Sequence, residues 1–216
     1  MKPLILAILP VAFLATPAAA EMEISVYTGV QSAPHSTIEG NDPGGVGVFD
    51  YNAGWDGKSF DMPPYYGFRA TWWRTERVGF ALEFNHAKVY ADDETLADTG
   101  FSRLEFTDGL NIVTLNAFYR WTSESRRWTP YVGAGAGVAI PHVDIQSAGG
   151  KTFEYQLTGP ALQLVAGASY DLNEKWAVFG EYKGTYTQNE ADLDSGGTLE
   201  TDLITNALNI GLTFRF

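Results

Sequence analysis

The chain ends with the stretch NALNIGLTFRF, residues 206–216. Every second residue from position 208 is large and apolar: Leu208, Ile210, Leu212, Phe214 and Phe216. The residues between them are mostly small or polar. This period of two predicts a β-strand with one apolar and one polar face. In a transmembrane barrel the apolar face contacts lipid and the polar face lines the lumen, so we expect this strand to close a barrel.

The same alternation recurs along the whole chain. Seven further strands are predicted, at residues 23–32, 65–73, from 78 onwards, 110–121, 128–140, 160–170 and 176–186. Short connections alternate with long polar ones at 33–64, 90–108, 142–158 and 187–203. The sequence therefore predicts an all-β fold, an eight-stranded antiparallel transmembrane β-barrel with short periplasmic turns and long extracellular loops. A barrel of this size has room inside only for side chains or a small ligand, so an open pore is not expected.

Aromatic residues support this topology. They lie beside the short connections and at the chain end: Trp72, Trp73, Trp121, Trp128, Trp176 and Phe216. Tryptophan gathers where a membrane meets water, so these positions predict an aromatic girdle at the periplasmic end of the barrel.

The N-terminus predicts a secretory signal peptide. Lys2 precedes an apolar run from Leu4 to Leu14, and small residues follow up to Ala20. We expect a signal peptide at 1–20 and an outer-membrane barrel domain at 21–216. No run of about 18 apolar residues follows, so no membrane helix is predicted. The chain has no cysteine, which excludes disulfides and cysteine-ligated metals.

Charge is distributed unevenly. The formal net charge is −12, which argues against nucleic acid as a partner because phosphate binding needs a basic surface. The four long connections hold 18 acidic residues but only three bases, Lys58, Arg103 and Lys151. We therefore expect an acidic outer surface on a nearly neutral barrel. Its acidic loops are candidate sites for divalent cations, or simply solvated surface. We expect a monomer.

Charged residues also fall on the inward faces of the predicted strands. Charges in a water-poor lumen must be paired and hydrogen-bonded, so the first interpretation is a structural network of ion pairs. Arg69, Glu181 and Lys183 lie towards the middle or outer part of their strands. They are the candidate catalytic residues if the lumen carries chemistry.

The three histidines, His35, His86 and His142, each follow an odd-numbered strand and are expected at the outer rim. Asp92 and Asp93 are among the acidic residues expected there. Imidazole together with carboxylate suits a transition metal such as iron, manganese or zinc. These five residues are the candidate metal ligands, and chance placement in a large outer region is the alternative.

Several motifs resemble the outer-membrane lipid A oxidase family. They are Ala33-Pro34-His35-Ser36, Gly40-Asn41-Asp42-Pro43-Gly44, Pro63-Pro64-Tyr65-Tyr66-Gly67, Asn85-His86-Ala87-Lys88-Val89-Tyr90, Ala139-Ile140-Pro141-His142 and Gly180-Glu181-Tyr182-Lys183-Gly184. The resemblance spans most of the chain after residue 20. It implies oxidation of the proximal glucosamine of lipid A to 2-aminogluconate in the outer leaflet, with oxygen as oxidant and a divalent metal as cofactor.

The resemblance leads to a working hypothesis with two rivals. In the hypothesis, a rim metal held by His86 and His142 with Asp92 or Asp93 activates oxygen beside the sugar. Because lipid A is anionic, its binding needs bridging divalent cations or a base such as Lys88, Arg69 or Lys183. The first rival is a non-enzymatic structural or adhesin-type barrel. The second is a lipid A deacylase or acyltransferase, which would need a serine such as Ser36 near a histidine.

Overall fold

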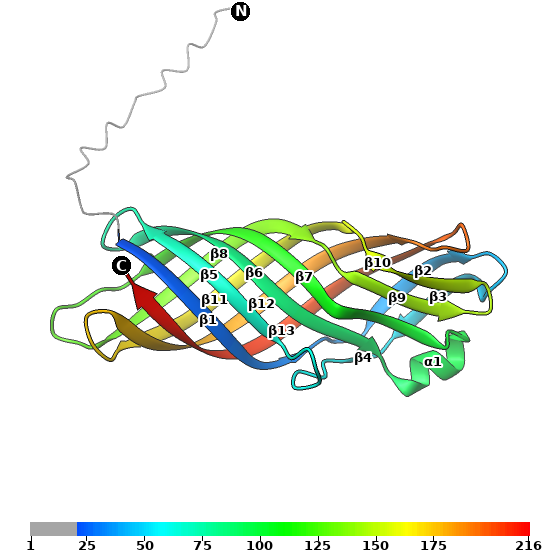
Figure 1. Cartoon of the computed structure of the whole chain (residues 1–216), viewed down its shortest axis with the longest axis horizontal. Helices are drawn as coiled ribbons and strands as arrows, with labels where there is room; N and C mark the ends of the chain where they lie inside the picture. Colours follow the sequence, from blue (N-terminus) through cyan, green and yellow to red (C-terminus); the bar gives the residue numbers. More distant parts are fainter. Residues whose placement is uncertain (1–20) are drawn as a thin grey trace, which may run out of the picture.

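The barrel closes between its first and last strands. In this computed structural model, which describes residues 21–216 except the side chains of residues 107 and 108, eight long strands form a closed antiparallel ring. They are β1 (Glu21–Ser32), β5 (Tyr66–Trp73), β6 (Val78–Ala91), β7 (Arg103–Arg120), β8 (Trp128–Ala139), β11 (Gly159–Asp171), β12 (Trp176–Asp192) and β13 (Thr198–Arg215). The ring is an elongated cylinder, with β1 beginning and β13 ending at the same rim (Figure 1). The predicted number of strands and their antiparallel arrangement are confirmed.

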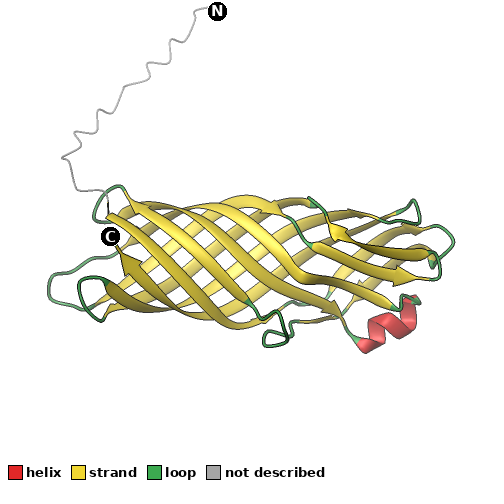
Figure 2. Ribbon diagram, viewed as in Figure 1, coloured by secondary structure: helices red, strands yellow, loops and turns green. Residues whose placement is uncertain are grey.

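The four long connections contain more structure than expected. They include β2 (Ser36–Asp42), β3 (Gly47–Ala53), β4 (Trp55–Asp56), α1 (Asp93–Thr99), β9 (His142–Ser147) and β10 (Gly150–Tyr155). These elements, together with the ends of β6, β7, β12 and β13, gather at the end opposite the short turns (Figure 2). The long connections lie where they were expected, and they are ordered over much of their length because their backbone groups continue the hydrogen-bonded ladders of the barrel. We call this region the outer half.

Strand length explains the outer half. A transmembrane strand needs about 9–11 residues, whereas β12 has 17 and β13 has 18. These two strands pair without interruption from Trp176↔Phe214 to Asp192↔Thr198. Each therefore crosses the membrane and continues well beyond it.

The two faces of β13 exchange character along its length. Near the C-terminal end the outward side chains are apolar, with Leu208 63% and Ile210 66% exposed, while Asn209 is buried in the lumen. Near the start of β13 the outward residues are Glu200 and Asp202, and the buried ones include Leu199 and Leu203. The part of the barrel nearer the short turns therefore has apolar side chains outside and polar side chains inside, as lipid requires. The outer half instead has an apolar core, like a water-soluble domain.

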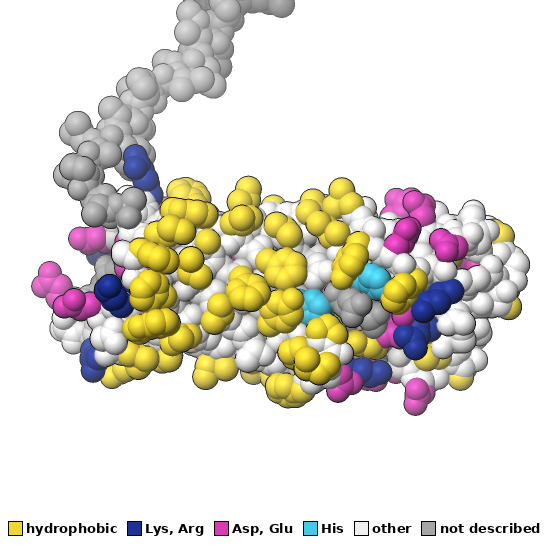
Figure 3. All heavy atoms as spheres, in the orientation of Figure 1, with side chains coloured by type: hydrophobic (Ala, Val, Ile, Leu, Met, Phe, Trp, Pro, Cys, Tyr) yellow, Lys and Arg dark blue, Asp and Glu magenta, His cyan; other side chains and the backbone are white. Residues whose placement is uncertain are grey.

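The lipid-facing side chains form a band around the lower part of the barrel. Hydrophobic side chains cover this part in Figure 3, and charged side chains lie mainly towards the two ends. The expected aromatic girdle is present except for Trp73, which is 6% exposed and points into the lumen. Trp73 follows the inward parity of Arg69 and Thr71, and the guanidinium of Arg120 lies 3.8 Å from its ring centre.

A network of paired charges crosses the middle of the lumen. Arg69 bonds Glu83 through Nε at 2.7 Å and Glu181 through Nη2 at 2.8 Å. Lys183 pairs with Glu83, and the hydroxyls of Tyr27 and Tyr131 donate to Glu83 and Glu181. The four charged side chains are at most 6% exposed and their formal charges sum to zero. The residues predicted to face inward thus build the ion-pair network that a narrow lumen demands.

The predicted signal peptide, residues 1–20, lies outside the described residues. None of the helices in the described part of the chain is long and apolar enough to cross a membrane.

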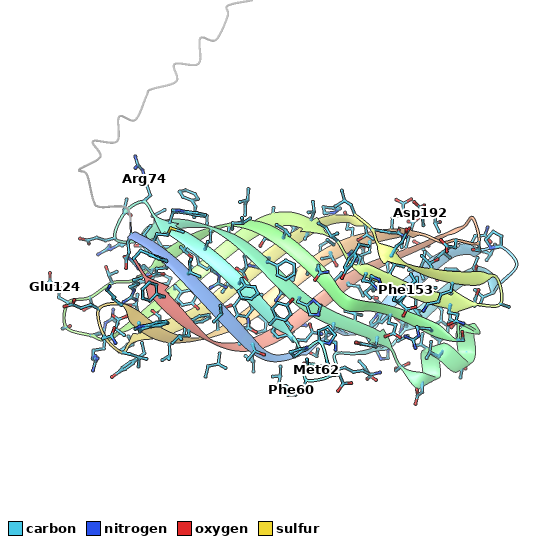
Figure 4. The ribbon with its side chains drawn as sticks, in the orientation of Figure 1. Phe60, Met62, Arg74, Glu124, Phe153 and Asp192 are labelled. Atoms are coloured by element: carbon cyan, nitrogen blue, oxygen red, sulfur yellow. The ribbon has the colours of Figure 1, made fainter. Side chains whose placement is uncertain are left out.

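We expect Arg69→Met to destabilise the barrel by about 3–5 kcal/mol, because it leaves Glu83 and Glu181 short of a buried partner. The measurement is urea-induced unfolding from lipid vesicles, followed by tryptophan fluorescence. Arg74→Met is the control, since Arg74 is exposed at a turn on the barrel rim (Figure 4). Equal stability of the two variants would contradict a structural role for the network.

Candidate functional site

The three candidate catalytic residues lie together in the lumen. Arg69, Glu181 and Lys183 belong to the central charge network, and Asn209 also donates to Glu181 at 3.2 Å. Towards the short turns Arg69 lines a small cavity of about 40 Å³, enough for a few water molecules. Towards the outer half the apolar core lies above them, including Tyr65 at 1% exposure. This arrangement holds the barrel wall together, and it offers the three residues no open path to the outer surface.

His86 lies on the outward face of β6, at the upper edge of the lipid-facing band. It is 3% exposed because its ring stacks on Tyr66, with 4.8 Å between ring centres. Its Nδ1 is 2.9 Å from the side-chain oxygen of Asn111, its register partner on β7. Stacking and hydrogen bonding thus fix the orientation of the imidazole.

His142 begins β9 and faces outward in the outer half. It is 5% exposed, enclosed by the rings of Phe153 and Tyr155 with centres 4.4 and 4.7 Å away. Its Nδ1 has no hydrogen-bond partner among the described residues. His142 is therefore a buried imidazole with an unused nitrogen.

His35 and Asp92 meet at a different place. They line an open pocket of about 310 Å³ with Tyr51 and Glu94. Asp92 caps α1, and the hydrogen bond from the Thr95 backbone is the main reason that the pKa of this carboxyl lies below its usual value. The positive charge of a protonated His35 would lower this pKa further.

The structure does not gather the five candidate metal ligands into one cluster. Among the described residues, no group of three or more His, Asp or Glu side chains could hold a metal ion. His86 and His142 do share one outward face, opposite Asn111 and Thr107 on β7. Asp93 is exposed in the first turn of α1, and His35 belongs with Asp92 in the pocket described above. The described donors thus do not fit a complete metal site.

Ser36 is engaged elsewhere. Its hydroxyl accepts a hydrogen bond from Trp55 Nε1 at 2.8 Å and lies 3.0 Å from the hydroxyl of Thr201. These contacts hold Ser36 in a structural position, which does not favour it as the nucleophile of an acyl-transfer reaction.

Sequence reasoning missed a convergence of bases. Lys58, Lys88, Arg103 and Lys151 all lie on one wall of the outer half, built from β4, β6, β7, β9 and β10 and the segment after β4. We call this the basic wall and these four residues the cationic patch. The ammonium groups of Lys58 and Lys88 lie 4.5 and 5.2 Å from the ring centre of Tyr90. The available signal was that three of the four are the only bases in the long connections.

Two carboxylates, those of Asp144 and Glu105, form ion pairs with bases of the cationic patch. Asp144 forms ion pairs with Arg103 at 2.9 Å and with Lys151 at 3.4 Å. Glu105 forms an ion pair with Arg103 at 3.1 Å. Burial raises the pKa of Glu105, although the charges of Arg103, Lys58 and Lys151 act in the opposite direction. Lys58 contacts Tyr90, whose register partner on β7 is Glu105, and Arg103 pairs with Glu105, so these two bases lie near one another.

The second wall of the outer half is acidic. It consists of β2, β3 and the outer ends of β12 and β13, and it contains no Lys or Arg. Glu190, Glu200 and Glu39 follow one another across three paired strands. They line an open groove of about 710 Å³ with Asp202. The two walls therefore present opposite chemistry to their surroundings.

Comparison with known proteins identifies the family. A family model described as outer membrane protein beta-barrel domain matches residues 6–216. No curated protein is recognisably similar to the chain in sequence. Among solved structures, Neisserial surface protein A superimposes with a TM-score of 0.52 at 14% identity, covering 92% of this chain and 98% of its own. AlkL, determined in lipid bilayers, has a TM-score of 0.50 at 17% identity, with coverages of 96% and 97%. The chain therefore belongs to the outer membrane protein beta-barrel domain family and is a bacterial outer-membrane β-barrel.

Proposed function

We propose that this protein is a closed, non-enzymatic outer-membrane barrel that acts through its outer half, as a structural or adhesin-type surface protein. The observation that carries the proposal is the occluded lumen. The network of Arg69, Glu83, Glu181 and Lys183 fills the middle of the barrel, and the apolar core fills the space above it. A solute has no route through such an interior.

The ordered outer half supports this proposal. Long flexible loops would lose conformational entropy on binding a partner, whereas these hairpins are already held in place. Gln156 bonds both the backbone nitrogen and the carbonyl of Asp192, joining the basic wall to β12. Phe49 and Phe101 pack edge to face, joining β3 to the segment that precedes β7. The outer half is therefore a rigid platform with two chemically different walls.

We expect the purified barrel to show no ion-conducting steps in a planar lipid bilayer. The charge network and the apolar core leave no continuous water path, so the current should stay at the level of the bare membrane. Insertion is checked separately by tryptophan fluorescence of the same preparation in vesicles. Stable conductance of the folded wild-type protein would overturn the proposal of a closed barrel.

A lipid A oxidase is the second candidate, and one observation favours it. His86 and His142 lie on the same outward face above the lipid-facing band, and each is almost fully buried. A sugar headgroup in the outer leaflet would lie at this level. In this reading, oxygen takes two electrons and two protons from the free hemiacetal carbon of the proximal glucosamine and leaves as hydrogen peroxide. Water then opens the resulting lactone to the carboxylic acid, so the sugar gains one oxygen atom. A divalent metal remains part of this second proposal, although the described residues do not by themselves complete a site for it.

We expect lipid A from cells that express the protein under oxygen to gain one oxygen atom on the proximal sugar if this second candidate is correct. The gain should disappear in the variant His86→Ala/His142→Ala and persist in His35→Ala, whose histidine lies in the separate pocket with Asp92. Mass spectrometry of extracted lipid A provides the measurement, and heat-dependent gel mobility checks folding. Unmodified lipid A in the wild-type strain would remove the oxidase and leave the surface barrel.

A further inference from the structure

Several strands of the outer half lie at an edge of the sheet, and two of these edges are protected. In the part of the chain that the structure describes, β3 pairs only with β2, but α1 lies beside it. The hydroxyl of Tyr51 on β3 donates to Asp98 of α1 at 3.0 Å. The edge strand β4 has only two residues. A free edge attracts other strands, and proteins protect it with a covering element or by keeping it short. Neither edge is therefore open to a further strand.

A side chain protects the outer edge of β12. The amide nitrogen of Gln156 donates to the carbonyl of Asp192 at 2.9 Å, and its oxygen accepts from the backbone nitrogen of Asp192 at 2.8 Å. Two residues earlier, the backbone nitrogen of Glu190 donates to the carbonyl of Thr158 at 3.0 Å. The amide of Gln156 thus replaces the backbone of a neighbouring strand, so this edge is also closed.

The edge of β10 has no such protection. Among the described residues β10 pairs only with β9, so it ends the sheet (Figure 1). A two-residue turn makes Ser147 and Gly150 a hydrogen-bonded pair. Because this pairing alternates along an antiparallel ladder, Lys151, Phe153 and Tyr155 direct their N–H and C=O groups away from β9. In the described part of the chain, no hydrogen bond reaches the main chain of β10 from that side.

The same edge carries exposed aromatic side chains. Phe153 and Tyr155 are 56% and 58% exposed, and Leu157, two residues further on, is 69% exposed (Figure 4). The buried ring of His142 packs against both aromatic rings. Exposed aromatic residues are frequent anchors of protein interfaces, and rings that are already held in place lose little conformational entropy on binding. His142 thus supports two ordered anchors beside the free backbone groups.

The opposite face of β10 has a different character. Thr152 is 3% exposed and accepts a hydrogen bond from the backbone nitrogen of Asp194 at 2.9 Å, which fixes the strand in place. Glu154 lies on the same face as Thr152, but it is exposed. A strand added beside β10 would therefore meet two aromatic rings on one face and a carboxylate on the other. Cross-strand neighbours of opposite charge, and pairs of aromatic and β-branched residues, stabilise such pairing.

We propose that β10 is the docking edge for an extended segment of a partner protein, which adds one antiparallel strand to the sheet. Its backbone pairs with Lys151, Phe153 and Tyr155, and its apolar side chains, at every second position, pack on the two rings. A basic residue on its other face lies beside Glu154. Free N–H and C=O groups at the spacing of a β-ladder are complementary to another extended backbone. The inference rests on the proposed partner-binding role of the outer half, and it names the class of partner and the residues that hold it.

The test is binding of a labelled peptide to the full barrel in nanodiscs of zwitterionic lipid, measured by fluorescence anisotropy. The probe alternates valine with threonine and carries one lysine on the threonine face. Two control peptides are N-methylated, one at its valines and the other at its threonines. In antiparallel pairing the valines lie opposite the rings and direct their N–H groups to β10. We expect methylation of the valines to weaken binding at least about tenfold, because backbone hydrogen bonds are lost, and methylation of the threonines to leave it unchanged. Equal binding of the two methylated peptides would overturn the proposal.

Two pairs of variants locate the site. Lys151→Pro removes one edge-facing N–H, and proline is tolerated where this group faces solvent, so we expect binding about tenfold weaker. Lys151→Gln removes the same charge, keeps the N–H and should bind like the wild type. Phe153→Thr/Tyr155→Thr should also bind more weakly, whereas Val48→Thr, which removes an 86% exposed side chain from β3, should not. Equal binding by Lys151→Pro and Lys151→Gln would contradict pairing at this edge. Heat-dependent gel mobility checks that each variant is folded.

Hydrogen exchange separates strand addition from contact with the rings alone. The bound peptide should slow exchange of the amides of Lys151, Phe153 and Tyr155, which have no partner in the free barrel. Unchanged exchange of these amides would overturn the proposal, as would absence of binding or equal binding of the peptide to empty nanodiscs. A wild-type dimer that Lys151→Pro dissociates would instead assign the edge to a second copy of this chain. These results do not depend on the conductance measurement, because a conducting barrel with a free β10 edge still binds the peptide and a closed barrel with a blocked edge does not.

Discussion

The pairing of charges inside a lumen without bulk water is the constraint on which the rest of the barrel depends. Arg69 lies between Glu83 and Glu181, and Lys183 completes the neutral set. An isolated charge at this depth would be strongly destabilising. Arg69 and Glu83 are register partners on β5 and β6, and Glu181 and Lys183 come from β12. The network therefore depends on the observed register of these strands. The ion pairs therefore help to specify the register as well as fill the lumen.

The outer half has the opposite arrangement of side chains, with polar residues outside and apolar residues inside. Beyond the lipid band the outward face meets water, and the same alternation along a strand must then bury apolar rather than polar residues. β13 makes this change within a few residues, between the buried Leu203 and the buried Asn209. The result is a single ladder of strands that supports an inside-out barrel at one end and an apolar core at the other. This core closes the lumen from above and holds the hairpins in fixed positions.

Electrostatic asymmetry follows from the way these hairpins are assembled. The acidic wall joins β12 and β13 to the β2–β3 hairpin, and the basic wall joins β6 and β7 to the β9–β10 hairpin. A closed barrel with an average acidic charge can therefore carry one local basic surface. The partner-binding role proposed for the outer half can use this difference, because an acidic wall attracts cations and a basic wall attracts anions.

Much of the membrane-spanning part could be predicted from the sequence, because a period of two with one apolar face is typical of a β-strand and eight such strands are typical of a small barrel. That pattern predicted the strands, the short turns, the inward direction of Arg69, Glu181 and Lys183, and the outer-membrane class. The prediction of the aromatic girdle failed for Trp73, because it gave the tendency of tryptophan to lie at interfaces more weight than the inward parity of this position. Glycine, asparagine, aspartate and proline in the first long connection indicate a loop, and this composition gives no sign of the β2–β3 hairpin that the connection forms.

The sequence by itself determined the barrel, since local alternation and strand length depend only on near neighbours. Only the tertiary structure decided which distant residues meet. His86 and His142 share a face, His35 lies in one pocket with Asp92, and Arg103 contacts both Glu105 and Asp144. These relations depend on the register of paired strands and on the path of the segment after β4, and no local pattern in the chain encodes either.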